Sequence, residues 1–114
     1  MAECLFCKML TGKIVPDIVH ENDHVLAFHD INPQAPVHVL IIPRKHIASL
    51  NDMHDSDAAL IGELYIAAKE IAILTGIADS GYRTVMNCNA DAGQSVFHIH
   101  LHVLGGRRLQ WPPG

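Results

Sequence analysis

The sequence predicts an α+β domain, with a mainly antiparallel sheet of about five strands, one short helix and one long helix. Three observations predict this class. Residues 37–42 are the strongest β-branched run and predict a central strand. Residues 58–75 repeat apolar side chains at helical spacing. Residues 98–104 alternate histidine with aliphatic side chains, the period of a half-buried strand. A short helix, strands, a long helix and further strands, in that order, are typical of α+β domains.

The first half of the chain is expected to hold the short helix and three strands. The helix covers Glu3 to Leu10 and is stopped by Gly12, and Pro16 breaks any later helix. A loop of fixed shape from Asp30 to Pro36 carries two prolines. The expected strands are 18–21, 25–28 and 37–42.

The long helix has more apolar surface than one packing face requires. We expect Asp55 or Ser56 to cap it, Thr75 to be near its end and Gly76 to stop it. Two adjacent apolar stripes run along it, Leu60, Leu64, Ala67, Ile71 and Leu74 in the first and Ile61, Tyr65, Ala68 and Ala72 in the second. An ordinary surface helix buries one stripe. Two stripes indicate packing on the sheet and on a second surface, unless the helix is simply sunk in a small core.

Composition bounds the class of protein. The 114 residues are expected to form a single domain over residues 1–114. Hydrophobic residues make up 49% and charged residues 18%, which predicts a globule with apolar surface left for an oligomer. A net charge of −4 argues against nucleic acid as a partner. No apolar run reaches the roughly 18 residues of a membrane span, and no secretory leader pattern opens the chain. We therefore expect a cytoplasmic protein with no membrane partner. Three cysteines, which cannot all pair, fit a reducing compartment.

A run of histidines is the strongest chemical signal. A strand over 82–88 and a Gly- and Asx-rich loop over 87–93 lead into it. The following strand points His98, His100 and His102 to one face. Such a run alone equally predicts a metal-binding or merely polar outer face of an edge strand.

Histidine also offers nucleophilic chemistry. A neutral imidazole aimed at phosphorus forms a nucleotidyl-histidine and leaves again as a cation. His100 is best placed, because it has an imidazole on each side. His102 and His38 would supply hydrogen bonds or positive charge to phosphate oxygens. The remaining histidines are expected on the solvated surface, and they are His20, His24, His29 and His54.

Longer stretches carry a resemblance to a known family. His98 to Leu104 fits the motif His-φ-His-φ-His-φ-φ, with φ apolar, of the histidine triad (HIT) family. Residues 27–38 and 42–47 resemble the nucleotide-binding half of that family, and the ending from Gly105 to Gly114 is similar to its Hint branch. The resemblance covers nearly the whole chain and implies a HIT-like fold that forms a homodimer.

The resemblance also implies an activity. Relatives of this kind are purine nucleotide-binding hydrolases that cleave phosphoramidate-type bonds at the α-phosphate of nucleoside monophosphates, as an adenosine 5'-monophosphoramidase does. The substrate would be AMP-like or GMP-like, and no cofactor is required for catalysis. Dinucleoside polyphosphate hydrolase and nucleotidyl transferase of the same family are alternatives, although transferases usually carry glutamine at the position of His102. A nucleotide-binding adaptor or sensor with vestigial catalysis is the alternative from another class.

Residue roles follow from the resemblance alone. His100 matches the nucleophile, His102 the contact to phosphate and leaving group, His98 the residue that orients the nucleophile, and His38 the fourth member of the cluster. Asp30 matches the carboxylate that takes both ribose hydroxyls, which suits an ionised acid. The phosphate-side residues are Asn87, Gly93 and Ser95, with Ser95 near the leaving group. The apolar slot for the purine is formed by Leu5, Phe6, Met9, Phe28, Ile31 and Leu40.

A metal site is the last expectation. Cys4 and Cys7 form Cys-x-x-Cys, which alone indicates a redox pair, half of a zinc site or no site. Some zinc-containing relatives pair this motif with a histidine after the Ile-Pro strand and with the first triad histidine, here His46 and His98. The resemblance therefore implies a structural zinc that anchors the strand presenting His100.

Overall fold

The computed structural model describes residues 4–114, so Glu3, the expected first residue of the short helix, lies outside the described residues. Five strands form one antiparallel sheet in the order β1-β2-β3-β5-β4. This arrangement confirms the predicted α+β class. The elements are α1 (Leu5–Leu10), β1 (Ile18–Glu21), β2 (Val25–His29), β3 (Val37–Pro43), α2 (Ala58–Leu74), β4 (Tyr82–Val85), α3 (Asn89–Ala92) and β5 (Leu101–Gly105).

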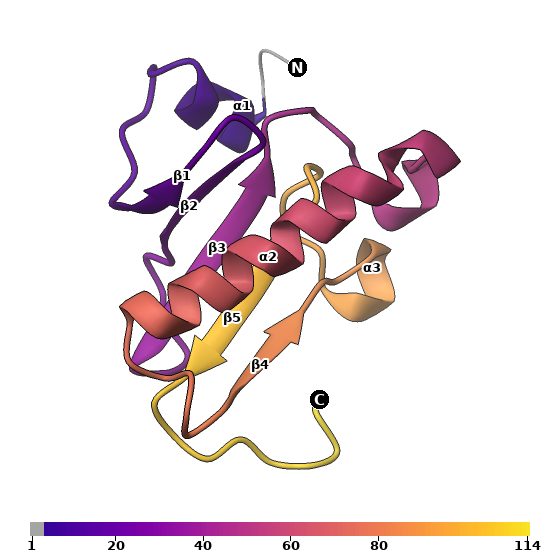
Figure 1. Cartoon of the computed structure of the whole chain (residues 1–114). Helices are drawn as coiled ribbons and strands as arrows, with labels where there is room; N and C mark the ends of the chain where they lie inside the picture. The colour runs from indigo at the N-terminus through magenta and orange to yellow at the C-terminus, as the bar shows by residue number, and fades with distance from the viewer. Residues whose placement is uncertain (1–3) are drawn as a thin grey trace.

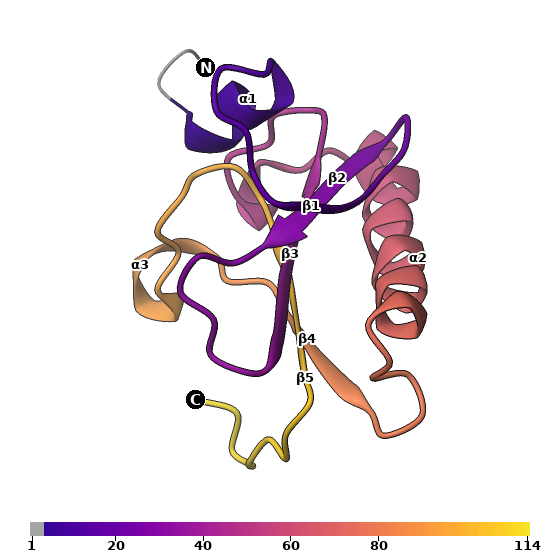
Figure 2. The same cartoon turned by 90° about the vertical axis from the view of Figure 1, so that its left-hand side faces the viewer.

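The sheet separates two apolar cores. Helix α2 covers one face, while α1, α3 and the C-terminal segment lie on the other side (Figures 1 and 2). On β2, Val25 and Ala27 face the α2 core, and Leu26 and Phe28 pack with Phe6 of α1. Strand β3 is divided between the two cores in the same way. Burial on both faces explains why the sequence of β3 is a continuous apolar run.

Helix α2 begins one or two residues later than predicted. It follows a 3-10 turn at Asp55–Asp57, and its N-cap residue is Asp57 rather than Asp55 or Ser56. The buried Asp57 carboxylate accepts hydrogen bonds from the His54 backbone N–H (2.9 Å) and from Lys45 Nζ (2.6 Å). Those two donors satisfy the buried acid. Gly76, with φ of +77°, follows the helix as predicted.

Both predicted stripes of α2 turn to the sheet in their central parts. Leu64, Ala67 and Ile71 of the first stripe are buried, as are Ala68 and Ala72 of the second. Leu74 of the first stripe and Tyr65 of the second are instead 65% and 50% exposed. With Ile66 and Ile73 they form an outer apolar face that the rest of the described chain leaves uncovered.

Three boundaries differ from the prediction. Strand β4 ends at Val85 instead of Cys88, and the short helix α3 lies within the expected loop 87–93. Strand β5 begins only at Leu101, since the backbone N–H of Ile99 donates to Ile47 O (2.8 Å) outside the ladder. His98 and His100 are 0% and 6% exposed, so the alternative of a merely polar outer face does not hold at these two positions. Within residues 4–114 no helix is long and apolar enough to cross a membrane.

Candidate active site

A cavity of about 460 Å³ opens between α1, the loop after it, β2 and the histidine strand. All six side chains of the expected purine slot line it, namely Leu5, Phe6, Met9, Phe28, Ile31 and Leu40. The polar groups at its other end are Asp30, Ser95, His100 and His102. Ile31 is fully exposed at the mouth, so its side chain is free to cover a bound ring. The cavity therefore joins an apolar slot to the histidine cluster, in the size range of small-molecule sites.

The orientation of His100 is set by the backbone. Its Nδ1 lies 2.9 Å from the carbonyl oxygen of His98. A carbonyl only accepts, so Nδ1 carries the proton and Nε2 keeps its lone pair. The ring packs against the edge of Phe6, with centroids 5.2 Å apart, and it lines the cavity. In the neutral form of the ring, Nε2 is therefore the nitrogen with the free lone pair.

His38 and His102 form a chain of fixed tautomers. The backbone N–H of Gln34 donates to His38 Nδ1 (3.0 Å), which leaves the proton of the neutral His38 ring on Nε2. His38 Nε2 lies 2.9 Å from His102 Nδ1, so it donates there and the His102 proton lies on Nε2. His102 lines the cavity, whereas His38 is buried behind it. His102 is therefore a hydrogen-bond donor through Nε2.

Burial keeps this pair neutral. It lowers the pKa of His102 to about 4, with neighbouring charge on His100 and His38 acting in the same direction and Asp30 opposing it. Burial also lowers the pKa of His38, partly offset by Asp30. Of the two forms the sequence allowed at His102, imidazolium or neutral donor, the structure favours the neutral donor at pH 7.

The Asp30 carboxylate lies at the junction of cavity and cluster. Its Oδ1 accepts the backbone N–H of Asn32 (2.8 Å), and its Oδ2 lies 3.4 Å from His38 Nε2. Each oxygen retains acceptor capacity, since an ionised carboxylate takes about four hydrogen bonds. The position suits an acceptor of two neighbouring hydroxyls.

The phosphate-side residues are brought together only in part. Ser95 is exposed and lines the cavity. Asn87 and Gly93 stand on either side of α3, and the lining formed by residues 4–114 includes neither. Gly93, with φ of +82°, ends α3 and turns the chain toward Ser95.

Several contributing residues escaped the sequence analysis. Gln94 is buried, and its amide donates to Ala48 O (2.7 Å) and Val96 O (3.1 Å) while accepting from Asn89 N (2.8 Å), which fixes the loop that carries Ser95. The rest line the cavity, and they are Ile14, Val15, Pro16, Asp17, His29 and Val96. His29 was expected on the solvated surface and not at the site; it is exposed, but it also lines the cavity. Its position directly before Asp30 was the available signal for a place at the site.

Four possible metal ligands converge beside His100. The ligand atoms of Cys4, Cys7, His46 and His98 all lie within 4.8 Å of one another. His46 Nδ1 is 3.2 Å from His98 Nδ1 and 3.3 Å from Cys7 Sγ, and His98 Nδ1 is 3.5 Å from Cys4 Sγ. A tetrahedron with the usual zinc bond lengths has edges of about 3.3 Å between nitrogens and about 3.6 Å between nitrogen and sulfur. The donor set and its spacing fit zinc.

The second nitrogen of His98 supports that reading. His98 Nε2 donates to Pro43 O (2.8 Å), so Nδ1 has its lone pair directed into the cluster. Ligating histidines commonly hold the other ring N–H in this way. His98 therefore connects this cluster to the segment before β5 that presents His100, and its own carbonyl holds the His100 ring.

Comparison with known proteins gives one consistent result. The HIT domain family matches the chain over residues 11–109. The chain is 51% identical over 115 residues to an "Uncharacterized HIT-like protein" of Synechocystis sp., covering all of both chains. It superposes on a HIT family hydrolase from Legionella pneumophila with a TM-score of 0.96 and 53% identity, over 98% of this chain and 100% of that one. It superposes on a histidine triad nucleotide-binding protein from Candida albicans with a TM-score of 0.82 and 29% identity, over 96% of this chain and 83% of that one.

Proposed function

The chain belongs to the HIT family, and from that premise we propose that it hydrolyses phosphoramidate-type bonds at the α-phosphate of purine nucleoside monophosphates. The observation that carries the proposal is the ring of His100, whose Nδ1 proton is bound by the His98 carbonyl. In the neutral ring this leaves Nε2 with the free lone pair that a nucleophile needs, beside a cavity that also carries the apolar slot. The hydrolase and nucleotide-binding descriptions of the relatives agree with this chemistry.

The reaction takes two displacements at phosphorus. In the first, a bond forms between His100 Nε2 and phosphorus, and the bond from phosphorus to the amine nitrogen breaks. Ser95, which is exposed, passes a proton from water to the departing nitrogen. In the second, a water oxygen bonds to phosphorus, the bond to Nε2 breaks, and the protons of the water go to solvent. The products are the free amine and the nucleoside monophosphate.

Charge at the phosphate is met by donors and not by cations. His102 Nε2–H faces the cavity and is aimed by the His38 hydrogen bond (2.9 Å). A fixed neutral donor stabilises oxygen charge that develops in the transition state without reorganising. Asp30 accepts the ribose hydroxyls and the apolar slot holds the purine.

Trapping the intermediate tests this mechanism. Adenosine phosphoramidate is mixed with the protein and quenched in base, where a nucleotidyl-histidine survives. We expect an adenylyl group on His100 by peptide mass spectrometry, and retention of configuration at a chiral phosphorus. Inversion at phosphorus would refute the two-step reaction.

A binding variant separates the enzyme from a nucleotide sensor. His100→Ala should abolish turnover while AMP still binds. A wild-type protein that binds AMP tightly and turns over neither the adenosine nor the guanosine phosphoramidate would instead be a binding module. Acyl-adenylates and dinucleoside polyphosphates, assayed in parallel, identify the leaving group.

We also propose that Cys4, Cys7, His46 and His98 hold one structural zinc ion. The ion would fasten α1 to the histidine strand and take no part in the chemical steps. Its support is the spacing and tautomer of the ligands given above. Metal analysis of untagged protein purified without chelator should find about one zinc per chain, and Cys4→Ser should lower the melting temperature. Less than about 0.2 zinc per chain, with an unchanged melting temperature in Cys4→Ser, would end the proposal.

A symmetric homodimer is the third proposal. The outer apolar face of α2 carries Tyr65, Ile66, Ile73 and Leu74, and strand β4 is an open edge of the sheet. A two-fold axis would bury this face and edge twice. Sedimentation at micromolar concentration should give twice the mass of the chain, and a monomeric mass would refute the dimer.

A further inference from the structure

The turn after β5 is attached to the loop that orients the His38 and His102 rings. Two residues make the attachment, Gly106 and Arg107, and both lie outside the cavity proposed for the nucleotide. We propose that Arg107 is a positioning residue that maintains the tautomer of His102 through Gln34 and His38. The effect on catalysis rests on the proposed function, whereas the effect on the tautomer does not.

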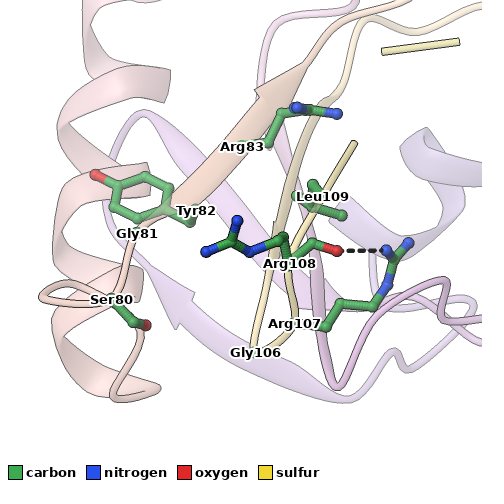
Figure 3. Close-up of a pocket in the computed structure, with 8 residues that line it drawn as sticks. All are labelled: Ser80, Gly81, Tyr82, Arg83, Gly106, Arg107, Arg108 and Leu109. Carbon is green, nitrogen blue, oxygen red and sulfur yellow. Dashed lines mark hydrogen bonds between the residues drawn. The ribbon is translucent and has the colours of Figure 1, made fainter. Parts of the chain in front are cut away.

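Two N–H groups of the Arg107 guanidinium donate hydrogen bonds to a single carbonyl oxygen, that of Gln34. The Nε and Nη2 of Arg107 donate to Gln34 O at 3.1 Å and 3.0 Å, and its Nη1 donates to Arg108 O at 3.1 Å. Figure 3 shows this last bond, with the Arg107 side chain directed away from Tyr82 while the Arg108 guanidinium extends toward it. Three bonds from one rigid planar group fix Gln34 relative to the end of β5, which a flexible lysine would not do.

Gly106 brings the backbone close enough for this contact. A Cβ on Gly106 would lie 2.9 Å from Pro36 Cβ, and its φ is +90°. Only glycine combines that approach with that backbone conformation at low cost. The loop from Asp30 to Pro36 is therefore packed on Gly106 at one end and chelated by Arg107 at Gln34.

Gln34 passes this constraint to the cluster. Its backbone N–H donates to His38 Nδ1 (3.0 Å), and the Nε2 proton of His38 is directed at His102 Nδ1 (2.9 Å). The Asp30 Oδ2, 3.4 Å from His38 Nε2, favours the same proton position. If Gln34 moves away, His38 is free to take its proton on Nδ1 and to accept from His102. The His102 proton then moves to Nδ1, and a lone pair on Nε2 faces the phosphate oxygens.

Adjacent arginines provide a matched pair of variants. Arg108 has the same charge as Arg107, and the two side chains line a second cavity of about 500 Å³, separate from the one proposed for the nucleotide. Arg108 contributes only its backbone carbonyl to this network. Arg107→Ala and Arg108→Ala therefore remove equal charge, but only the first releases Gln34. Arg107→Lys restores the charge without the chelate.

The experiment reads the tautomers directly. Long-range ¹H–¹⁵N spectra of ligand-free, ¹⁵N-histidine-labelled protein assign the protonated nitrogen of His38 and His102 at pH 7.5. We expect Nε2–H on both rings in the wild type and in Arg108→Ala, and a mixture of Nε2–H and Nδ1–H in Arg107→Ala and Arg107→Lys. With adenosine phosphoramidate we expect kcat to fall about tenfold in the two Arg107 variants, below the ~10²–10³ lost when a donor to developing charge is removed. KM should change little.

Two results would overturn the inference. Unchanged tautomers in Arg107→Ala would do so whatever happens to activity, because a purely structural role leaves them intact. An equal loss of kcat in Arg108→Ala would assign the effect to charge. The spectra need no substrate, so a protein without phosphoramidase activity would sink the proposed function and still leave the tautomer test decisive.

Discussion

Replacing His102 by asparagine should make the fold less sensitive to acid. The His102 ring is mostly buried, and its pKa is lowered from 6.5 to about 4, first by burial and then by the neighbouring His100 and His38. Below pH 6.5 the unfolded chain protonates this ring and the folded chain does not. The unfolded state therefore binds more protons, and the free energy of unfolding falls as pH falls.

The size of the effect follows from the two pKa values. Linkage between 6.5 and about 4 removes about 2 kcal/mol from the free energy of unfolding at pH 5 and about 3 kcal/mol at pH 4, relative to pH 7.5. Asparagine keeps an acceptor for His38 and does not titrate. His102→Asn should consequently lose about 2 kcal/mol less stability than the wild type between pH 7.5 and pH 5.

Urea unfolding at the two pH values measures this difference. His24→Asn is the matched control, because His24 is exposed in the turn before β2 and makes no part of the cluster. It should follow the wild type. Parallel losses of stability in wild type and His102→Asn would refute the assignment of a depressed pKa to His102.

Three further outcomes are expected. Gln94→Glu removes the amide that donates to two carbonyls and fixes the loop carrying Ser95. It should raise KM several-fold with a smaller effect on kcat. Steady-state kinetics in which both values stay constant would contradict this expectation. Ile66→Glu puts a charge on the outer face of α2 and should convert the proposed dimer to monomer in sedimentation, whereas an unchanged mass would place the interface elsewhere. Asp57→Asn should destabilise the protein fully above about pH 4 and progressively less as pH falls below it. The Lys45 hydrogen bond, and then that of the His54 backbone, lower the carboxylate pKa from 3.8, and this stabilisation disappears as pH falls through the folded pKa. Equal destabilisation at pH 3 in thermal unfolding would contradict it.

The sequence predicted the sheet well because its central strands have distinct patterns of apolar residues. The continuous run of β3 lies between two cores, and the alternation of β5 separates the α2 core from the histidine side. Those patterns depend on local period alone. The placement of α1 over the histidines is a tertiary contact, made by Phe6 against His98 and His100. The alternation of side chains carries no information about such a cover, so the burial of these two histidines could not be predicted from it.

Element ends were harder to predict than element types. Helix α3 has four residues and begins at Asn89, whose φ is +64°. Four residues are too few to show a helical repeat of apolar side chains, so the sequence did not predict this helix. The start of β5 depends on where the backbone of Ile99 finds its partner, which is Ile47, a residue far away in the chain. The composition of the cavity was predicted through side chains of known chemical type. The buried amide of Gln94 and the chelate of Arg107 depend on geometry between loops, and no residue pattern indicated either.

Backbone groups set the protonated nitrogen of three buried histidine rings at this site. Four imidazoles lie close together, and full protonation of such a cluster would be costly once it is buried. Pro43 O binds one nitrogen of His98, His98 O binds one of His100, and the Gln34 N–H binds one of His38. Each neutral partner leaves the second nitrogen of its ring with one defined role. The tautomers, and with them the proposed division between nucleophile, donor and metal ligand, are therefore set by loops and strand ends without added charge.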